Sequence, residues 1–241
     1  MSMSVIIPAL NEEKYIKQTL THIHISTVYL LKQYTCNVEV IVVDNGSSDR
    51  TADIALSNDA KVIREDEQGI ARATNIGAKH SEGSILIFID ADTIIPESLL
   101  TRVYELLSRP KYVGGAVEPD YRPKSKSVRI YLRLWAKLAN YLSIAQGVTQ
   151  FSTRDAFEDI GGYNESLYMS EDIYFYWKLS DYAKNKGLDT VYIDDIKVEP
   201  SCRRLDQWPL WKTILWTNPI TTRLFLGSKG FWRHWYDDPP R

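Results

Sequence analysis

The sequence contains little cysteine and no long apolar run. Its two cysteines, Cys36 and Cys202, form no C-x-x-C pair, which argues against a thiolate metal site and suits a reducing compartment. The longest uncharged central stretch, Leu138–Thr153, contains several amides and is too short and too polar to span a bilayer. The first apolar run, Val5–Leu10, has no basic residue before it, so we expect no secretory signal and a cytoplasmic location.

Acidic residues are missing from two segments of a chain that is otherwise balanced. The net charge is −2, which is ordinary for a globular protein and unlike a nucleic-acid-binding one. Residues Tyr121–Arg154 carry seven Lys or Arg and no acid, and Gln207–Tyr236 carries four more beside five of the seven tryptophans. Such residues suit a lipid interface, so we predict peripheral contact with a membrane. The alternative is that both segments pack on the domain.

What the sequence does contain is an alternation of short apolar strands and amphipathic helices. The predicted strands are Val5–Ile7, Val38–Val43, Val62–Ile63, Ile85–Ile89, Gly147–Ser152 and Thr190–Ile193. The predicted helices are Glu12–Tyr34, a segment capped by Ser47–Asp49 and running through Ser57, Gly69–Lys79, Pro96–Ser108, Val128–Leu142 and Glu171–Lys186. This order predicts an α/β fold with a mostly parallel sheet covered by helices on both faces.

A proline or an aspartate stands where three of the predicted strands end. These residues are Pro8, Asp44 and Asp90. Ligands of open parallel sheets bind at the carboxyl ends of the strands, so we expect the three positions to line one crevice.

Two carboxylates follow the most apolar strand directly. Asp90 and Asp92 are separated by one residue after Ile85–Ile89, and such a pair can share Mg²⁺ or Mn²⁺, which prefer oxygen ligands and often bridge to phosphates. The alternative is a solvated turn rich in aspartate. The four histidines, at 22, 24, 80 and 234, all lie away from this motif. None is therefore assigned as a third ligand, and Asp206 is one candidate for that place.

Four sequence motifs in order strengthen the metal interpretation. SVIIPALNEEKYI at 4–16, VDNGSSDRT at 43–51, GIARATNIGAKHSEGSILIFIDAD at 69–92 and FEDIGGYNESLYMSED at 157–172 resemble the inverting family 2 glycosyltransferases, which have a GT-A fold. The resemblance implies a glycosyltransferase domain over 1–205, with a nucleotide-sugar half at about 1–117 and an acceptor half at about 118–205. The tail, 206–241, would pack on the domain or face a membrane.

The resemblance also implies roles for individual residues. It assigns the donor base and ribose to Pro8, Asn11, Glu12 and Asp44, and the donor diphosphate to Gly69, Arg72, Asp90, Arg203 and Arg204. Simpler explanations stand beside four of these assignments: Glu12 as an acid at a helix N-terminus, Asp44 in an Asx turn, Arg72 as a solvated arginine, and Arg203 with Arg204 as a basic pair on the surface. The sequence departs from many relatives at Thr74, where they have arginine.

Glu171 and Asp172 match the family's acidic pair, in which the aspartate is usually the catalytic base. They follow Gly161-Gly162-Tyr163, another family motif. A base here would take the proton from an acceptor hydroxyl. The alternative is a pair of acids favoured by a helix dipole.

We therefore expect a metal-dependent enzyme that uses a nucleotide sugar, with UDP favoured over GDP, and a glycan or lipid-linked acceptor. Two other functions are compatible with parts of the sequence. A haloacid-dehalogenase-like phosphohydrolase also has D-x-D after a strand, but there the motif lies near the N-terminus and continues D-x-D-x-[TV], whereas Ile94 takes the later place here. A non-catalytic nucleotide-sugar-binding protein would not need Asp90, Asp92 and Asp172 together.

Overall fold

An eight-stranded sheet organises the chain. The computed structural model describes residues 1–141, 148–167 and 170–217. The strand order is β3-β2-β1-β4-β7-β6-β8-β5. In chain order the strands are β1 (Ser2–Ala9), β2 (Asn37–Asp44), β3 (Lys61–Arg64), β4 (Ile85–Ile89), β5 (Thr93–Ile94), β6 (Tyr112–Pro119), β7 (Thr149–Thr153) and β8 (Asp189–Pro200).

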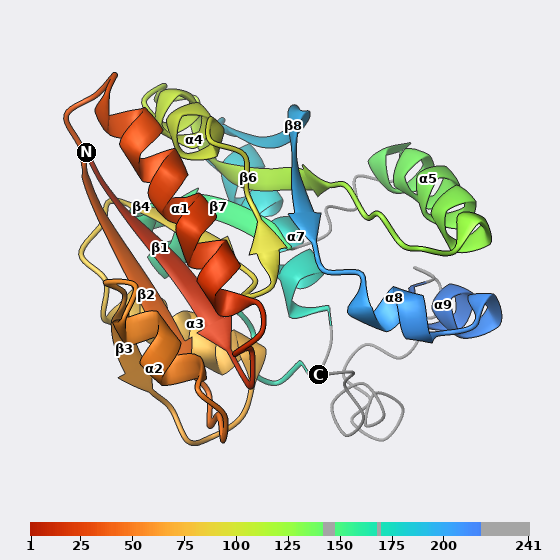
Figure 1. Ribbon diagram of the computed structural model, residues 1–241. Coiled ribbons are helices and arrows are strands. Elements are labelled where there is room, and N and C mark those ends of the chain that lie inside the picture. The colour runs from red at the N-terminus through yellow and green to blue at the C-terminus, as the bar shows by residue number, and fades with distance from the viewer. Residues whose placement is uncertain (142–147, 168–169, 218–241) are drawn as a thin grey trace.

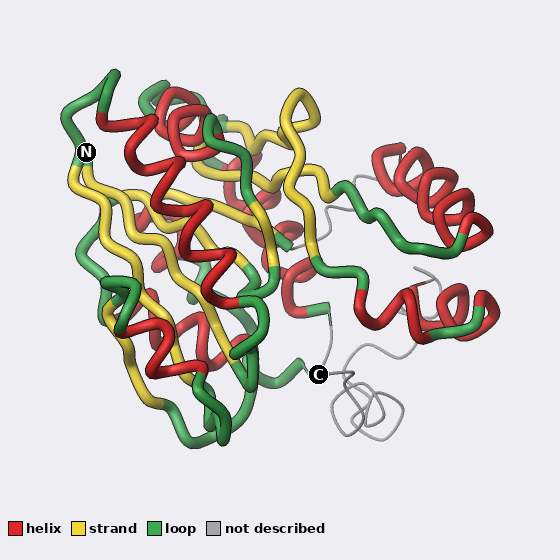
Figure 2. Tube along the Cα trace, in the orientation of Figure 1, coloured by secondary structure: helices red, strands yellow, loops and turns green. Residues whose placement is uncertain are grey.

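Helices cover both faces of the sheet, and three more lie beyond its edge (Figures 1 and 2). They are α1 (Ile16–Leu31), α2 (Thr51–Leu56), α3 (Ile70–Lys79), α4 (Leu99–Leu107), α5 (Lys126–Tyr141), α6 (Arg154–Asp159), α7 (Glu171–Asn185), α8 (Arg203–Gln207) and α9 (Leu210–Thr217). The α/β class expected from the sequence is confirmed.

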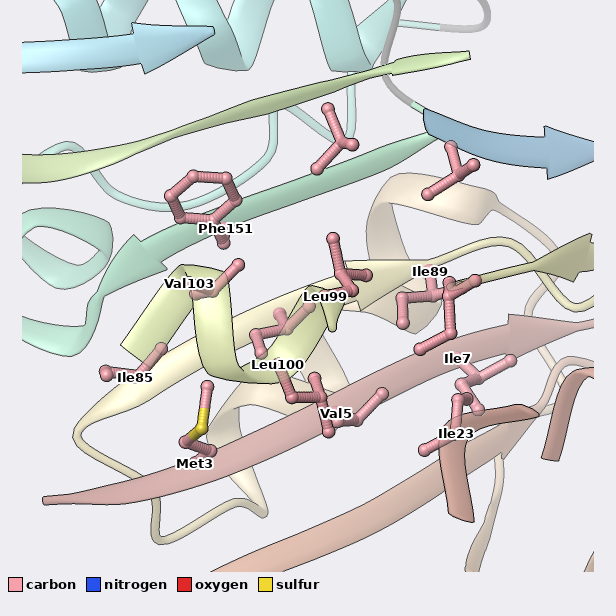
Figure 3. Close-up of a cluster of buried hydrophobic side chains, with 14 of the residues drawn as sticks. Met3, Val5, Ile7, Ile23, Ile85, Ile89, Leu99, Leu100, Val103 and Phe151 are labelled. Carbon is pink, nitrogen blue, oxygen red and sulfur yellow. The ribbon is translucent and has the colours of Figure 1, made fainter. Parts of the chain in front are cut away.

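Strand β1 explains why the core has two layers. Successive side chains of a strand point to opposite faces, so Met3, Val5 and Ile7 pack under α1 and α4, as Figure 3 shows. Ile6 points the other way and packs with residues of α3 and α7. Because β1 is buried on both faces, its sequence is a continuous apolar run without alternation.

The sheet is mixed, because β7 interrupts its parallel strands: β6 and β8 pair parallel with each other beyond β7, and β5 at the edge pairs antiparallel with β8. β3, β2, β1 and β4 run parallel, as predicted, but β7 pairs antiparallel with both β4 and β6. Strand β6 was missed because Gly114, Gly115 and Pro119 resemble loop residues. Both glycines are required by close packing, since a Cβ at Gly115 would lie 1.9 Å from the Val191 carbonyl oxygen.

The predicted start of helix α2 was wrong. The helix begins at Thr51 rather than after a Ser47–Asp49 cap, and its N-cap residue, Arg50, makes no side-chain capping bond. The Asp49 carboxylate instead accepts hydrogen bonds from the backbone N–H groups of Thr51 and Glu13. It therefore closes a loop.

Helices α5, α8 and α9 form a unit of their own, which we call the C-terminal helical unit. Val128 and Leu132 of α5 pack with Leu205 of α8 and Leu210 of α9. The Tyr131 hydroxyl is 3.0 Å from the Thr217 hydroxyl of α9. The expected domain boundary at 205/206 falls inside α8, and the part of the predicted tail beyond 217 lies outside the described residues.

Replacing Gly115 with alanine should destabilise the fold by about 2–3 kcal/mol or more, because the new methyl group would meet a strand backbone that cannot move cheaply. Urea unfolding measures the change. Gly69→Ala is the control, since its Cβ would meet only Arg72 Cβ at 3.6 Å, and it should cost less than about 1 kcal/mol. Equal stability of the Gly115→Ala variant and the native chain would show that β6 is placed wrongly.

Candidate functional site

The polar strand ends meet at one edge of the sheet, as the sequence predicted. β1 lies between β2 and β4, and Ala9 at its end pairs with Asp44 at the end of β2. Ile6 pairs with Phe88 of β4, two residues before Asp90. Pro8, Asp44 and Asp90 therefore share the carboxyl edge, where ligands of such sheets bind.

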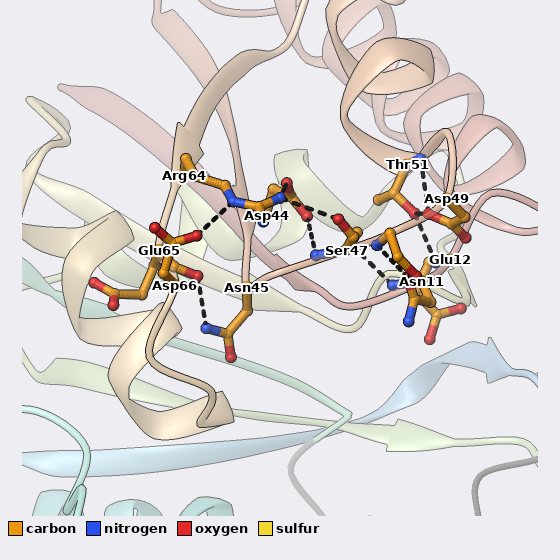
Figure 4. Close-up of polar contacts among 11 residues, drawn as sticks. Asn11, Glu12, Asp44, Asn45, Ser47, Asp49, Thr51, Arg64, Glu65 and Asp66 are labelled. Atoms are coloured by element: carbon orange, nitrogen blue, oxygen red, sulfur yellow. Dashed lines mark hydrogen bonds and ion pairs between the residues drawn. The ribbon is translucent and has the colours of Figure 1, made fainter.

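Two loops at this edge are tied to each other (Figure 4). Asn11 has a positive φ of 55°, and its side-chain oxygen accepts the Ser48 N–H at 2.8 Å. The Glu12 N–H donates to the Thr51 hydroxyl at 2.7 Å. The described contacts of the Asn11 side chain thus fix loop shape.

Asp44 is buried and already has partners. Its side chain is 2% exposed and forms a 2.5 Å ion pair with Arg64, which is 52% exposed. Its other oxygen accepts the Ser47 N–H at 3.0 Å. The contact with Ser47 is of the Asx type that the sequence offered as the alternative role of Asp44. Arg64 is the solvent-facing partner of the same carboxylate (Figure 4).

Gly69 is the N-cap residue of helix α3 and is held by Asn45. The Asn45 amide oxygen accepts the Gly69 N–H at 2.7 Å, and its NH₂ group donates to the carbonyl oxygens of Glu65 and Glu67. Asn45 is 4% exposed, so this buried amide shapes the loop before α3.

Arg72 lies among acids. Its guanidinium is 3.3 Å from Glu65, 3.3 Å from Glu67 and 3.6 Å from Glu165. The sequence interpretation as a solvated arginine therefore underestimated its contacts. Within the described part of the chain, Arg72 forms ion pairs with these three carboxylates rather than with Asp90 or Asp92.

Asp90 and Asp92 form the centre of an acidic cluster. Burial raises the pKa of Asp90 well above its usual range, and the charges of Asp92, Asp172, Glu171 and Glu12 raise it further. Burial also raises the pKa of Asp92 to about 6, against the lowering effect of Arg203 and Arg204. The crowded carboxylates disfavour one another's ionisation.

Helix α7 supplies the other two acids from its first turn. Burial raises the pKa of Glu171 to about 8, and the charge of Asp172 adds to the rise. Ser170 before them is in the left-handed conformation and gives no side-chain cap. The helix dipole favours carboxylates at this position, but it does not offset burial.

Two residues without an assigned role position this helix end. The Gln150 side chain of β7 donates to the Asp172 carbonyl oxygen at 2.9 Å and accepts the Tyr163 hydroxyl at 2.8 Å. The Tyr163 ring stacks on Phe175 of α7 at 4.3 Å. The sequence signal that could have identified Gln150 is a polar amide inside a predicted buried strand.

Arg203 connects the helical unit to this edge. Both terminal nitrogens of its guanidinium donate to the Glu12 carboxylate, one of them at 2.6 Å, and one lies 3.3 Å from Asp92. The group also sits 4.8 Å from the centre of the Tyr15 ring. Glu12 is therefore paired with Arg203 across the site, and its contact with the donor stays a prediction.

The residues fit a divalent cation whose remaining ligands come from a bound phosphate group. Asp90 and Asp92 offer two carboxylates, and Mg²⁺ commonly binds through one or two carboxylates plus substrate phosphates. Within the described ranges, no group of three His, Cys, Asp or Glu side chains is arranged to hold a metal alone. The Asp206 carboxylate accepts the Lys124 N–H at 2.7 Å, so the guess of a third ligand gains no support.

Comparison with known proteins decides the family. The profile of glycosyl transferase family 2 matches residues 4–168. The chain belongs to glycosyl transferase family 2. It is 30% identical over 192 residues to glycosyltransferase AglE of Haloferax volcanii, covering 74% of this chain and 61% of that protein. It is 26% identical over 194 residues to poly-beta-1,6-N-acetyl-D-glucosamine synthase of Staphylococcus epidermidis, covering 73% and 45%.

Solved structures confirm the GT-A fold. S. aureus TarS 1–349 in complex with UDP-GlcNAc superposes with a TM-score of 0.63 at 21% identity, over 83% of this chain and 58% of that one. Mannosyltransferase PcManGT from Pyrobaculum calidifontis, with GDP-Man and Mn²⁺, gives 0.62 at 22%, over 82% and 56%. The chain spans between about a third and three fifths of the length of the first curated relatives it matches.

The acidic cluster should make stability fall as pH rises. A carboxyl whose folded pKa is raised stabilises the fold fully below its unfolded pKa and loses that contribution as pH passes its folded pKa. For Glu171 the window runs from 4.5 to about 8. We expect the urea midpoint, measured without divalent cations, to fall across this window, and Glu171→Gln to reduce the fall. The exposed Glu97→Gln is the control, and an unchanged pH profile in Glu171→Gln would contradict the burial of Glu171.

Proposed function

We propose that the chain is an inverting glycosyltransferase that moves a sugar from a nucleoside-diphosphate sugar to an acceptor hydroxyl. UDP is the favoured nucleotide and GDP the second choice. The observation that carries the proposal is the meeting of Asp90, Asp92 and the Glu171–Asp172 pair at the carboxyl edge of the sheet. Family membership and the nucleotide-sugar complexes of TarS and PcManGT support it.

Asp92 and Asp90 would hold a divalent cation, Mn²⁺ or Mg²⁺. Bound there, the cation would neutralise charge on the diphosphate as it leaves. Arg203 and Arg204 lie close enough to lower the pKa of Asp92, and they would add positive charge beside the same leaving group. The Mn²⁺-containing structure of PcManGT supports a metal role in such folds.

Asp172 would act as the base. As the acceptor oxygen attacks the anomeric carbon, the bond from that carbon to the diphosphate breaks and the carboxylate takes the hydroxyl proton. Gln150 fixes the backbone of Asp172, which orients the group. Burial raises the pKa of Glu171, so the neutral form of this neighbour would limit repulsion with an ionised Asp172.

Asp44, with Pro8, Asn11, Glu12, Gly69 and Arg72, would line the nucleotide side. A buried carboxylate can accept a hydrogen bond from a base N–H or a ribose hydroxyl, although Arg64 now covers one oxygen of Asp44. Asn11 and Gly69 would act through loop shape, as their contacts with Ser48 and Asn45 indicate.

The acceptor is proposed to be a glycan or a lipid-linked molecule of the cell envelope. Poly-beta-1,6-N-acetyl-D-glucosamine synthase and 4,4'-diaponeurosporenoate glycosyltransferase, the latter of Staphylococcus haemolyticus and 38% identical over 121 residues (47% of this chain, 30% of that protein), are relatives by sequence. Their names support an envelope polymer or a lipid as acceptor class.

Two substitutions should separate metal binding from base catalysis. Asp92→Asn should abolish Mn²⁺-dependent UDP binding in titration calorimetry, because it removes an anionic ligand. Asp172→Asn should keep that affinity while nucleotide release from a panel of UDP- and GDP-sugars falls by ~10²–10⁴. Asp195→Asn is the matched control, since Asp195 is 55% exposed and pairs with Arg102 on the surface.

Each alternative function has its own outcome in this experiment. Unchanged metal-dependent affinity in Asp92→Asn would remove the metal assignment. Normal turnover in Asp172→Asn would move the base role to Glu171. Binding of a nucleotide sugar with no turnover of any donor would indicate a non-catalytic binding protein, and release of inorganic phosphate from phosphate esters would indicate a phosphohydrolase.

We further propose that the chain works in the cytoplasm, where nucleotide sugars are made, in peripheral contact with the membrane. No described helix is long and apolar enough to cross a bilayer. The C-terminal helical unit exposes large apolar side chains on α5 and α9, namely Ile130, Leu134, Trp211, Ile214 and Leu215. Neither helix contains an acid.

The basic residues of 121–154 do not all contribute to this surface. Arg122 pairs with Asp120 and Glu199, and Arg154 donates to backbone carbonyls between β4 and α3. Lys126 and Arg133 are exposed on α5 and form no ion pair within the described part of the chain. Their charges suit an anionic lipid surface.

Vesicle sedimentation tests this location. The protein should bind phosphatidylcholine vesicles that contain phosphatidylglycerol, and binding should weaken as salt shortens the screening length from ~10 Å at 0.1 M to ~3 Å at 1 M. Leu134→Glu with Trp211→Glu should reduce binding at least about tenfold. Leu56→Glu is the control, because Leu56 is 58% exposed on α2. A protein that stays in the supernatant at low salt favours a soluble acceptor, and a changed oligomeric state in the double variant points to a second copy instead.

A further inference from the structure

Arg203 occupies the position from which a positive charge acts on Asp92. Arg203 is 15% exposed, Glu12 12% and Asp92 17%, so the three groups are largely withdrawn from water. Glu12 engages both terminal nitrogens of the guanidinium, and Tyr15 covers it at 4.8 Å. Because Glu12 and Tyr15 hold the planar guanidinium on two sides, it has few other positions available. Its charge therefore stays beside Asp92.

This charge affects any cation that approaches Asp92. Like charges a few ångströms apart repel strongly in a partly buried site, and the arginine lies 3.3 Å from the carboxylate that the cation would bind. Within the described residues no third acid, histidine or cysteine completes a metal site. A divalent cation arriving alone therefore finds Asp90 and Asp92 as ligands, with a guanidinium 3.3 Å from Asp92. The nearby Glu12 is engaged by that same guanidinium.

We propose that Arg203, positioned by Glu12, is the resident counter-cation of Asp92 and makes divalent-cation binding conditional on a nucleoside diphosphate. The anionic diphosphate supplies the oxygen ligands that the protein lacks, and it offsets the repulsion between the cation and the guanidinium. Cation and nucleotide thus bind together, and the free protein holds the cation weakly. The inference rests on the metal site of the proposed function.

The C-terminal helical unit takes part in the site through Arg203. Arg203 is the first residue of α8, and Leu205, two residues later, packs against α5. The position of the helical unit thus fixes where the counter-cation stands. The sequence separation of 191 residues between Arg203 and Glu12 makes this contact a link between the two ends of the fold.

Electron paramagnetic resonance of free Mn²⁺ tests the proposal with Mn²⁺ alone and with Mn²⁺ plus UDP. The native protein should bind Mn²⁺ weakly alone and at least about tenfold more tightly with UDP. Arg203→Ala should bind Mn²⁺ alone at least about tenfold more tightly than the native protein, because the repulsion is gone. Arg203→Lys keeps the charge but loses the planar fork, so its affinity for Mn²⁺ alone should lie between those of the native protein and Arg203→Ala.

Two further variants keep the result interpretable. Arg203→Gln removes the charge but retains an amide that can donate to Glu12, and it should behave as Arg203→Ala does even if the alanine variant unfolds. Arg64→Ala removes an arginine from the aspartate at the neighbouring strand end, and it should leave the affinity for Mn²⁺ alone unchanged.

The outcomes separate this inference from the proposed function. If the native protein binds Mn²⁺ with UDP but Arg203→Ala and Arg203→Gln gain no affinity for Mn²⁺ alone, the counter-cation role is overturned while the metal site stands. If the native protein binds Mn²⁺ equally well with and without UDP, the conditional binding is overturned. If it binds no Mn²⁺ even with UDP, the metal site itself fails.

Discussion

Like-charge crowding at the carboxyl edge of the sheet is the constraint on which the rest of the site depends. Asp90 and Asp92 follow the end of β4 at Ile89, and α7 begins with Glu171 and Asp172 from the opposite half of the chain. Burial and mutual repulsion raise the pKa values of three of these acids. Such an arrangement destabilises the fold unless a positive charge lies close to it. Clusters of acids with shifted pKa values are common at functional sites.

The surrounding structure limits the cost in ways that also prepare the site. Arg203 brings a guanidinium to Asp92 and Glu12, and the N-terminus of α7 brings the positive end of a helix dipole to Glu171 and Asp172. Asn45 and Gln150, both buried amides, fix the loop before α3 and the start of α7. The charged groups are thus held by rigid neighbours, which is how electrostatic sites avoid reorganisation when ligand binds.

The sequence predicted those parts of the fold and site that depend on local pattern. Asp44 and Asp90 could be placed at one edge because apolar runs mark the strands and parallel strands end together. Strand β6 could not be predicted, because Gly114 and Gly115 serve packing against β7 and β8 rather than local propensity. The pairing of Glu12 with Arg203 and the contacts of Arg72 with three glutamates depend on tertiary structure. No periodicity or spacing encodes them.

Anomalous diffraction from crystals grown with Mn²⁺ and UDP tests the central claim most directly. The account predicts one Mn²⁺ peak between the Asp92 carboxylate and the diphosphate oxygens, with Asp90 beside it and the Arg203 guanidinium within hydrogen-bonding distance of the diphosphate. A Mn²⁺ peak away from Asp90 and Asp92, or UDP bound at this edge with no Mn²⁺ peak at all, would contradict it.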